Sequence, residues 1–193
     1  MLKPQDVVLL LKLLANPEHL KWSQAQMAMH LCISVSEVNA GIKRLIAAGL
    51  LHIAPPILLS LTALNERLQS NKQIDKLYKP ILRTCEEFLI SGVKYMFPAK
   101  LGEITAGIVT SYAAPVLKGY TTPGSDPVPV WPYAEGRQRG ASLTPLYSSV
   151  PKSVALFPDT NFYELLCLID ILRQGNCREY IKAVELLKER IKS

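Results

Sequence analysis

Hydrophobic residues near the start of the chain recur at the spacing of an amphipathic helix. They lie three or four positions apart: Val7, Val8, Leu11, Leu14 and Ala15. Pro4 fits the first turn of such a helix, because the N–H group that proline lacks would have no partner there. The pattern therefore predicts a helix that starts at Pro4 and stops near Asn16 and Pro17.

A second helix is predicted to begin at Ser23. Ser23 is a favourable N-cap residue, and Gln26 three positions later completes a capping box. The apolar positions of this helix are Met27, Ala28 and Leu31. A tight turn at Cys32 and Ile33 then separates it from the next helix.

The third predicted helix begins with a second capping-box pattern, formed by Ser34 and Glu37. Its apolar stripe consists of Val38, Ile42, Leu45 and Ile46. Gly49 is expected to end it as a C-cap glycine. Two capped helices joined by a tight turn are typical of a helix-turn-helix, and the first helix completes a trihelical core.

The residues after Gly49 favour a wing. Leu50 to Ile53 is predicted to be its first strand, and Ile57 to Leu61 is an apolar run of strand length. The elements predicted next are a helical turn at Thr62–Leu68, a polar connector at Ser70–Asp75 and a helix at about Pro80–Tyr95.

Prolines and glycines cluster between Met96 and Pro158, so regular helix is not expected there. The elements predicted in this segment are an exposed loop at Thr121–Pro129, a short strand with Val128, Val130 and Trp131, a turn at Glu135-Gly136, and a strand at Ala141–Tyr147. Two amphipathic helices follow, at Asn161–Leu172 and Arg178–Ile191. Gly175 is the expected C-cap between them, which gives an αα-hairpin.

These elements predict a mainly α protein with small β content, in the α+β class. The predicted division is a winged helix-turn-helix at 1–70, a linking helix at 71–95 and a Pro-rich α+β domain at 96–193. The last of these ends in the helical hairpin and is expected to bind a partner or an effector.

Charge and cysteine usage narrow the class of protein further. The formal net charge of +6 favours a polyanionic partner, and basic residues gather between Lys72 and Lys100. The four cysteines lie far apart and lack metal-binding spacing, so neither a disulfide framework nor a zinc site is expected. Neither a signal peptide nor a membrane-spanning run is expected, which indicates a cytoplasmic protein.

The side of the third helix opposite its apolar stripe carries residues suited to DNA recognition. Asn39 can form two hydrogen bonds with adenine in the major groove, and the small Ala40 allows a close approach. Ser36 is a second expected base reader. Lys43, Arg44 and Gln24 are expected to contact the phosphate backbone. The full set of expected DNA-binding residues is Gln24, Ser34, Ser36, Asn39, Ala40, Lys43 and Arg44.

A second group of residues combines aromatic rings with arginines in the Pro-rich segment. Its members are Trp131, Tyr133, Arg137, Arg139 and Tyr147. One interpretation is a site for a planar or anionic ligand, or for a partner protein, held by stacking and charge. In the other, Trp131 and Tyr147 pack beneath the C-terminal helices while both arginines face water.

The sequence contains no GxSxG, Walker or dinucleotide-binding motif, and its three histidines lie outside any recognisable catalytic arrangement. We therefore expect no enzymatic activity, no cofactor and no metal.

The stretch LCISVSEVNAGIKRLIAAGLL resembles the winged helix-turn-helix of bacterial MarR-like transcriptional regulators. The shared features are the turn, the Ser cap, the Val–x3–Ile–x2–Leu stripe and the Ala-Gly-Leu-Leu entry into the wing. The resemblance covers about the first 70 residues. It implies sequence-specific binding of double-stranded DNA by a homodimer, with the Ser36–Arg44 face in the major groove.

The function expected from the sequence is transcriptional regulation, as a repressor. The overall plan is also similar to that of abortive-infection antitoxins, so the alternative is an antitoxin or adaptor whose C-terminal domain binds a protein. A third hypothesis is regulation by a ligand bound near Trp131 and Arg137.

Overall fold

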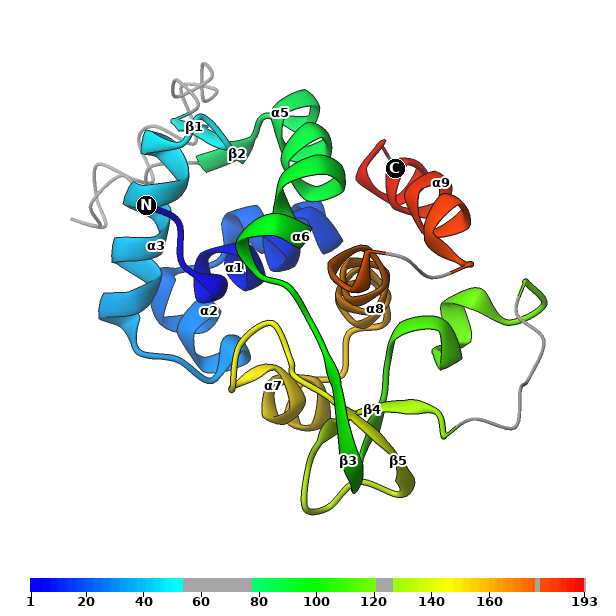
Figure 1. Ribbon diagram of the computed structural model, residues 1–193. Helices are drawn as coiled ribbons and strands as arrows, with labels where there is room; N and C mark the ends of the chain where they lie inside the picture. Colours follow the sequence, from blue (N-terminus) through cyan, green and yellow to red (C-terminus); the bar gives the residue numbers. More distant parts are fainter. Residues whose placement is uncertain (54–77, 121–126, 176–177, 193) are drawn as a thin grey trace.

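The computed structural model describes residues 1–53, 78–120, 127–175 and 178–192. The protein is mainly helical with small sheets, as the α+β prediction requires. Figure 1 shows the N-terminal helices on one side, the strands β3 to β5 at the opposite end from β1 and β2, and the C-terminal helix at the far side.

The N-terminal segment forms three helices in the predicted order. They are α1 (Pro4–Ala15), α2 (Gln24–Leu31) and α3 (Val35–Ala47), with a short 3₁₀ helix, η1 (Pro17–Lys21), after α1. The predicted capping box of α2 is confirmed. The Ser23 hydroxyl oxygen accepts a hydrogen bond from the backbone N–H of Gln26, and the side-chain oxygen of Gln26 accepts one from the backbone N–H of Ser23.

The turn between α2 and α3 lies where the sequence predicts it. Cys32 has a φ of 53°, a left-handed conformation that reverses the chain within a few residues. Ser34 accepts a hydrogen bond from the Glu37 amide, so the cap of α3 is confirmed. The second half of its capping box is wrong, because the Glu37 carboxylate accepts a hydrogen bond from Gln5 instead. Gly49 follows α3 with a φ of 70°, as expected of a glycine that ends a helix.

A short antiparallel strand pair follows α3. β1 (Leu51–Ile53) pairs with β2 (Tyr78–Pro80), so the predicted first strand is confirmed. The elements predicted at Ile57–Leu61, Thr62–Leu68 and Ser70–Asp75 lie outside the described residues. The helix predicted from Pro80 begins later because Pro80 belongs to β2. It consists of α5 (Leu82–Glu87), a π-helical turn, η2 (Phe88–Gly92), and α6 (Val93–Met96).

The Pro-rich segment contains more regular structure than its composition indicates. Its strands are β3 (Leu101–Val109), β4 (Pro129–Pro132) and β5 (Gln138–Leu143). β3 pairs antiparallel with both of the others, and β4 and β5 pair in parallel. Gly107 permits this arrangement, because a β-carbon there would collide with the carbonyl oxygen of Trp131.

The predicted strand that contains Val130 and Trp131 is confirmed, whereas the strand predicted at Ala141–Tyr147 begins and ends earlier, as β5. The sequence pattern does not predict the long strand β3. Most of the predicted loop at Thr121–Pro129 lies outside the described residues, and its last residue, Pro129, is buried in β4.

The expectation that this segment lacks regular helix is wrong. It contains α7 (Val150–Leu156) and two 3₁₀ turns, η3 (Ser111–Ala113) and η4 (Pro115–Leu117). Pro151 and Pro115 each lie in the first turn of their helix, where proline costs no backbone hydrogen bond.

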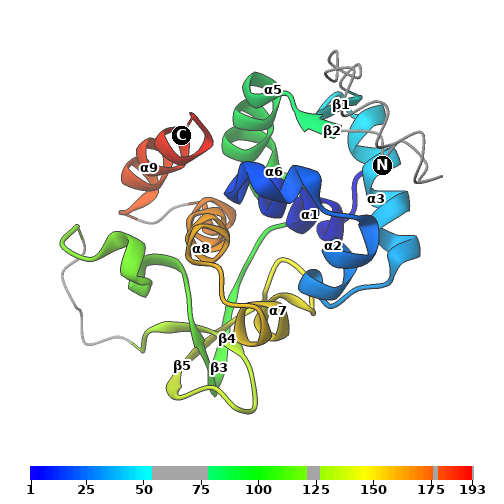
Figure 2. The same cartoon turned by 180° about the vertical axis from the view of Figure 1, so that it is seen from behind.

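The predicted C-terminal hairpin is formed by α8 (Thr160–Gln174) and α9 (Tyr180–Lys192), with Gly175 at a φ of 80° directly after α8. The prediction that α8 is amphipathic is wrong, because the run Leu165–Arg173 is buried on all sides. Both views show α8 in the centre of the molecule, between α1 and α9 (Figures 1 and 2).

Buried apolar side chains from α1, α2, α3, α5 and α8 belong to one connected core. α1 packs against α3 on one side and α8 on another. The predicted division into three parts stays a prediction, and the N-terminal helices do not form a core separate from that of α8.

Candidate nucleic-acid interface

The outer face of α3 presents four of the seven residues predicted to bind DNA. Ser36 and Lys43 are exposed, and Asn39 and Ala40 are half-buried between them. Residues three, four and seven positions apart share one face of a helix, so these four side chains form a continuous strip. We call this strip the α3 strip.

The opposite side of α3 explains why this strip faces outward. Val38 and Leu45 are fully buried and Ile42 is nearly so, against α1 and α2. Burial of an aliphatic side chain contributes about 1.5–3 kcal/mol, so three such residues fix the rotation of the helix about its axis. The apolar stripe read from the sequence therefore places the α3 strip in solvent.

Gln24 and Asn39 contact each other. The Nδ2 of Asn39 donates a hydrogen bond to Oε1 of Gln24 over 3.1 Å, which links the α3 strip to the first residue of α2. Both side chains are half-buried. Gln26, by contrast, is engaged in the cap of α2.

Arg44 is predicted to contact phosphates, and the structure places it in an ion pair inside the protein. Its Nε and Nη2 donate hydrogen bonds of 2.7 Å each to the two carboxylate oxygens of Asp6, whose side chain is fully buried. These hydrogen bonds raise the pKa of Arg44, and the nearby Glu37 carboxylate acts in the same direction. Ser34, the remaining predicted residue, is exposed and caps α3.

The strand pair lies directly beyond the C-terminal end of α3. Leu50 accepts a hydrogen bond from the Ile81 amide, and Thr84 of α5 donates one to the carbonyl of Gly49. β1 lies beside α3, and β2 pairs with β1. On the strand pair, the exposed His52 lies opposite Lys79. The middle position of the pair therefore carries a histidine and a lysine.

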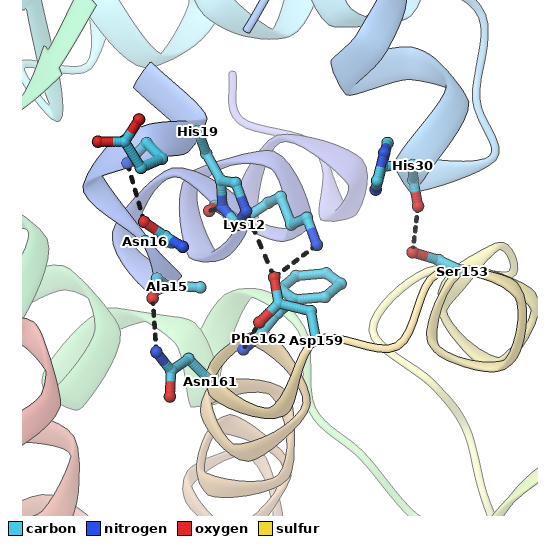
Figure 3. A network of polar contacts seen from close by, with 10 residues as sticks. Lys12, Ala15, Asn16, His19, His30, Ser153, Asp159, Asn161 and Phe162 are labelled. Atoms are coloured by element: carbon cyan, nitrogen blue, oxygen red, sulfur yellow. Dashed lines mark hydrogen bonds and ion pairs between the residues drawn. The ribbon is translucent and has the colours of Figure 1, made fainter. Parts of the chain in front are cut away.

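A polar network joins the N-terminal helices to the C-terminal half (Figure 3). The ammonium group of Lys12, which is 1 % exposed, lies 2.7 Å from Oδ2 of Asp159 at the start of α8. His19 lies beside the same carboxylate oxygen, at 3.5 Å, and its Nδ1 is 2.6 Å from the Lys12 carbonyl oxygen. Asn161 donates a hydrogen bond to the last residue of α1, Ala15.

Burial acts to raise the pKa of Asp159, but hydrogen bonds from Lys12 and from the Phe162 amide outweigh it and lower the pKa. The carboxylate is therefore the favoured form, and it compensates the charge of the buried Lys12. The network is a structural anchor for α1, since both charges and their hydrogen bonds are satisfied within it.

A row of aromatic rings in tilted contact continues this network towards α2. The ring centroid of Trp22 lies 4.2 Å from that of His19 and 4.3 Å from that of His30, and the Phe157 ring centroid lies 4.5 Å from that of His30. Ser153 of α7 donates a hydrogen bond to the His30 carbonyl. Burial lowers the pKa of both histidines, so their neutral forms are favoured.

The second predicted group does not come together as one site. Trp131 is fully buried and donates a 2.6 Å hydrogen bond to Asp170 of α8, whereas Arg137 and Arg139 are exposed. Tyr133 is half-buried, and Tyr147 is half-buried and packs against the core. These positions agree with the packing interpretation for Trp131, which contacts α8, and for both arginines, which are exposed.

The buried carboxylate of Asp170 has a full set of partners. It accepts hydrogen bonds from Thr110 and Trp131 and forms an ion pair of 2.5 Å with Arg173. Arg173 also donates to the carbonyl oxygens of Phe97 and Thr144. Burial raises the pKa of Asp170, with Arg173 acting against it. This network ties β4 and the loops around it to the central helix.

The sequence pattern does not predict three ion pairs made by buried or half-buried carboxylates. They are Asp6 with Arg44, Asp159 with Lys12 and Asp170 with Arg173. A signal was present for two of these contacts, because Lys12 interrupts an apolar helix and Asp170 lies within the apolar run of α8. Charges in such runs are buried only when paired, but the sequence does not identify the partner.

Within the described ranges, no group of three or more His, Cys, Asp or Glu side chains is arranged to hold a metal ion. Among the same residues, no helix combines the length and apolar character needed to cross a membrane. No family model matches the chain, and no curated protein or solved structure is significantly similar to it.

Proposed function

We propose that the protein is a sequence-specific DNA-binding regulator of transcription that inserts α3 into the major groove. The observation that carries this proposal is the α3 strip, exposed on the second of two capped helices joined by a tight turn. The order α1, α2, α3, then the pair β1 and β2, agrees with the winged helix-turn-helix of the MarR-like regulators that the sequence resembles.

The chemistry of the α3 strip suits base readout. A major groove admits one α-helix, and side chains near the start of a recognition helix contact base edges. Ser36 and Asn39 supply hydrogen-bonding groups in the first two turns, and Ala40 allows a close approach. Lys43, one turn further on, supplies a positive charge for the DNA backbone.

The charge available on α3 limits the affinity of one subunit. Arg44 is neutralised by Asp6, and Glu37 lies near the start of the helix. Each phosphate contact contributes through counterion release, so a single lysine gives weak binding. We therefore propose that the protein acts as a homodimer, as repressors of the MarR-like plan do, with further contacts from His52 and Lys79.

A selection experiment tests this function and identifies the operator at the same time. The purified chain is incubated with a library of random duplexes, and bound duplexes are amplified and sequenced over several rounds. The proposal predicts a recurring motif, with two half-sites about 10 base pairs apart if a homodimer binds. Enrichment of no motif, together with equal binding of all duplexes, would contradict it.

A further inference from the structure

We propose that Gln24 is a positioning residue that makes Asn39 select adenine over guanine. This inference rests on the proposed function, because it assumes that α3 reads bases in the major groove. It changes the role expected of Gln24 from the sequence, which is a contact to phosphate. The observation is the hydrogen bond between the two side-chain amides.

The geometry restrains the Asn39 amide from one side. Gln24 is the first residue of α2, and Asn39 lies in the second turn of α3, so the hydrogen bond crosses from one helix to the other. The start of α2 is itself fixed, since Ser23 and Gln26 complete their capping box in both directions. Gln24 therefore reaches Asn39 from a rigid position.

The hydrogen bond determines which groups of Asn39 remain for DNA. A side-chain amide has two N–H donors and one carbonyl acceptor. One N–H of Asn39 is given to Gln24, so one donor and the carbonyl oxygen are left. Adenine presents an acceptor at N7 and a donor at N6 in the major groove, which matches this remaining pair.

Guanine does not match the restrained amide. It presents two acceptors, N7 and O6, in the major groove. If Asn39 kept its hydrogen bond to Gln24, its carbonyl oxygen would face O6, and two acceptors would be brought together without a proton between them. An Asn39 released from Gln24 would be able to turn its amide nitrogen towards guanine, so the discrimination depends on Gln24.

The test compares the wild-type chain with Gln24→Ala, Gln24→Glu and Asn39→Ala. Fluorescence anisotropy measures the affinity of each for the selected duplex and for a duplex with G·C in place of A·T at the position that Asn39 reads. A ratio between two duplexes is internal to each variant, so it does not depend on the fraction of active protein. For the wild type we expect a preference of roughly 5- to 150-fold for adenine, the range given by one bidentate contact.

For a positioning role, Gln24→Ala should lower the adenine-to-guanine ratio towards that of Asn39→Ala, with the salt dependence unchanged. In the double variant, which adds Asn39→Ala to Gln24→Ala, the adenine-to-guanine ratio should fall little further. Gln24→Glu keeps an acceptor for Asn39, so it should retain the ratio while its negative charge weakens binding to both duplexes.

Two results would overturn the inference while leaving the proposed function intact. In the first, Gln24→Ala weakens binding to both duplexes by the same factor and reduces the salt dependence of the affinity, as loss of a phosphate contact would. In the second, the ratio is unchanged in Gln24→Ala. If the wild type selects no motif at all, the proposed function fails and this inference fails with it.

Discussion

The guanidinium group of Arg44 on α3 holds the carboxylate of Asp6 on α1 by two hydrogen bonds of 2.7 Å each. The Asp6 side chain is fully buried and that of Arg44 is 21 % exposed. This ion pair fixes the helix proposed to enter DNA onto the first helix of the core. A residue that looks like a phosphate contact in the sequence is thus part of the framework that orients the α3 strip.

Arg44→Met should therefore destabilise the fold. It removes the charged partner of a buried carboxylate, and breaking such a pair costs about 3–5 kcal/mol of unfolding free energy. Urea denaturation followed by circular dichroism measures this change. Lys43→Met is the matched control on the adjacent residue, and it should change the unfolding free energy by less than about 0.5 kcal/mol. Equal effects of both substitutions would contradict the structural role of Arg44.

Trp131→Phe should also lower stability, because it removes the indole N–H that donates to Asp170. A buried acceptor that loses a donor costs about 1–3 kcal/mol. Tyr133→Phe serves as the control, since the contact of the Tyr133 hydroxyl with Glu135 is exposed and 3.5 Å long. Chemical denaturation should distinguish the two variants, and a Trp131→Phe protein as stable as wild type would show that the hydrogen bond from Trp131 to Asp170 does not contribute to stability.

The two histidines in the row of tilted rings, His19 and His30, should make stability depend on pH below neutrality. Burial lowers the pKa of His19 from its ordinary value of 6.5, so the unfolded chain takes up a proton at a pH where the folded chain does not. The stabilisation is complete above pH 6.5 and is lost as the pH falls towards the folded-state pKa. Burial lowers the pKa of His30 too, so its contribution has the same sign.

Unfolding free energies measured at several pH values between about 7.5 and 5 should consequently decrease towards acid. One histidine contributes a slope of at most about 1.4 kcal/mol per pH unit. His19→Gln should reduce the slope, and the double variant with His30→Gln should reduce it further. The same slope in the wild type and in the double variant would rule out these two residues as its origin.

The parts of the fold that the sequence predicts well are those fixed by neighbours along the chain. The cap at Ser23, the turn at Cys32 and the stop at Gly49 each depend on a few adjacent residues, and all three agree with the structure. The stripe that rotates α3 is local as well, and it places Ser36 and Lys43 in solvent as expected.

The parts that the sequence does not predict depend on contacts between distant residues. β2 forms only because Tyr78–Pro80 pairs with Leu51–Ile53, and β3 is stabilised by pairing with β4 and β5. Asp159 lies 147 positions from its partner Lys12. The candidate site shows the same limit, because Asp6 and Gln24 decide what Arg44 and Asn39 can do.

The most direct test of DNA binding through the α3 strip is the salt dependence of affinity for the selected duplex in two lysine variants. Lys43→Ala should weaken binding to selected and unrelated duplexes by the same factor. It should also reduce the slope of log K against log salt by about 0.9 for each subunit that loses a phosphate contact. Lys118 is an exposed lysine directly after η4, and Figure 1 shows the chain around η4 on the opposite side of the molecule from α3. Lys118→Ala should therefore bind like wild type. Wild-type affinity and slope in Lys43→Ala, with weaker binding in Lys118→Ala, would contradict the account.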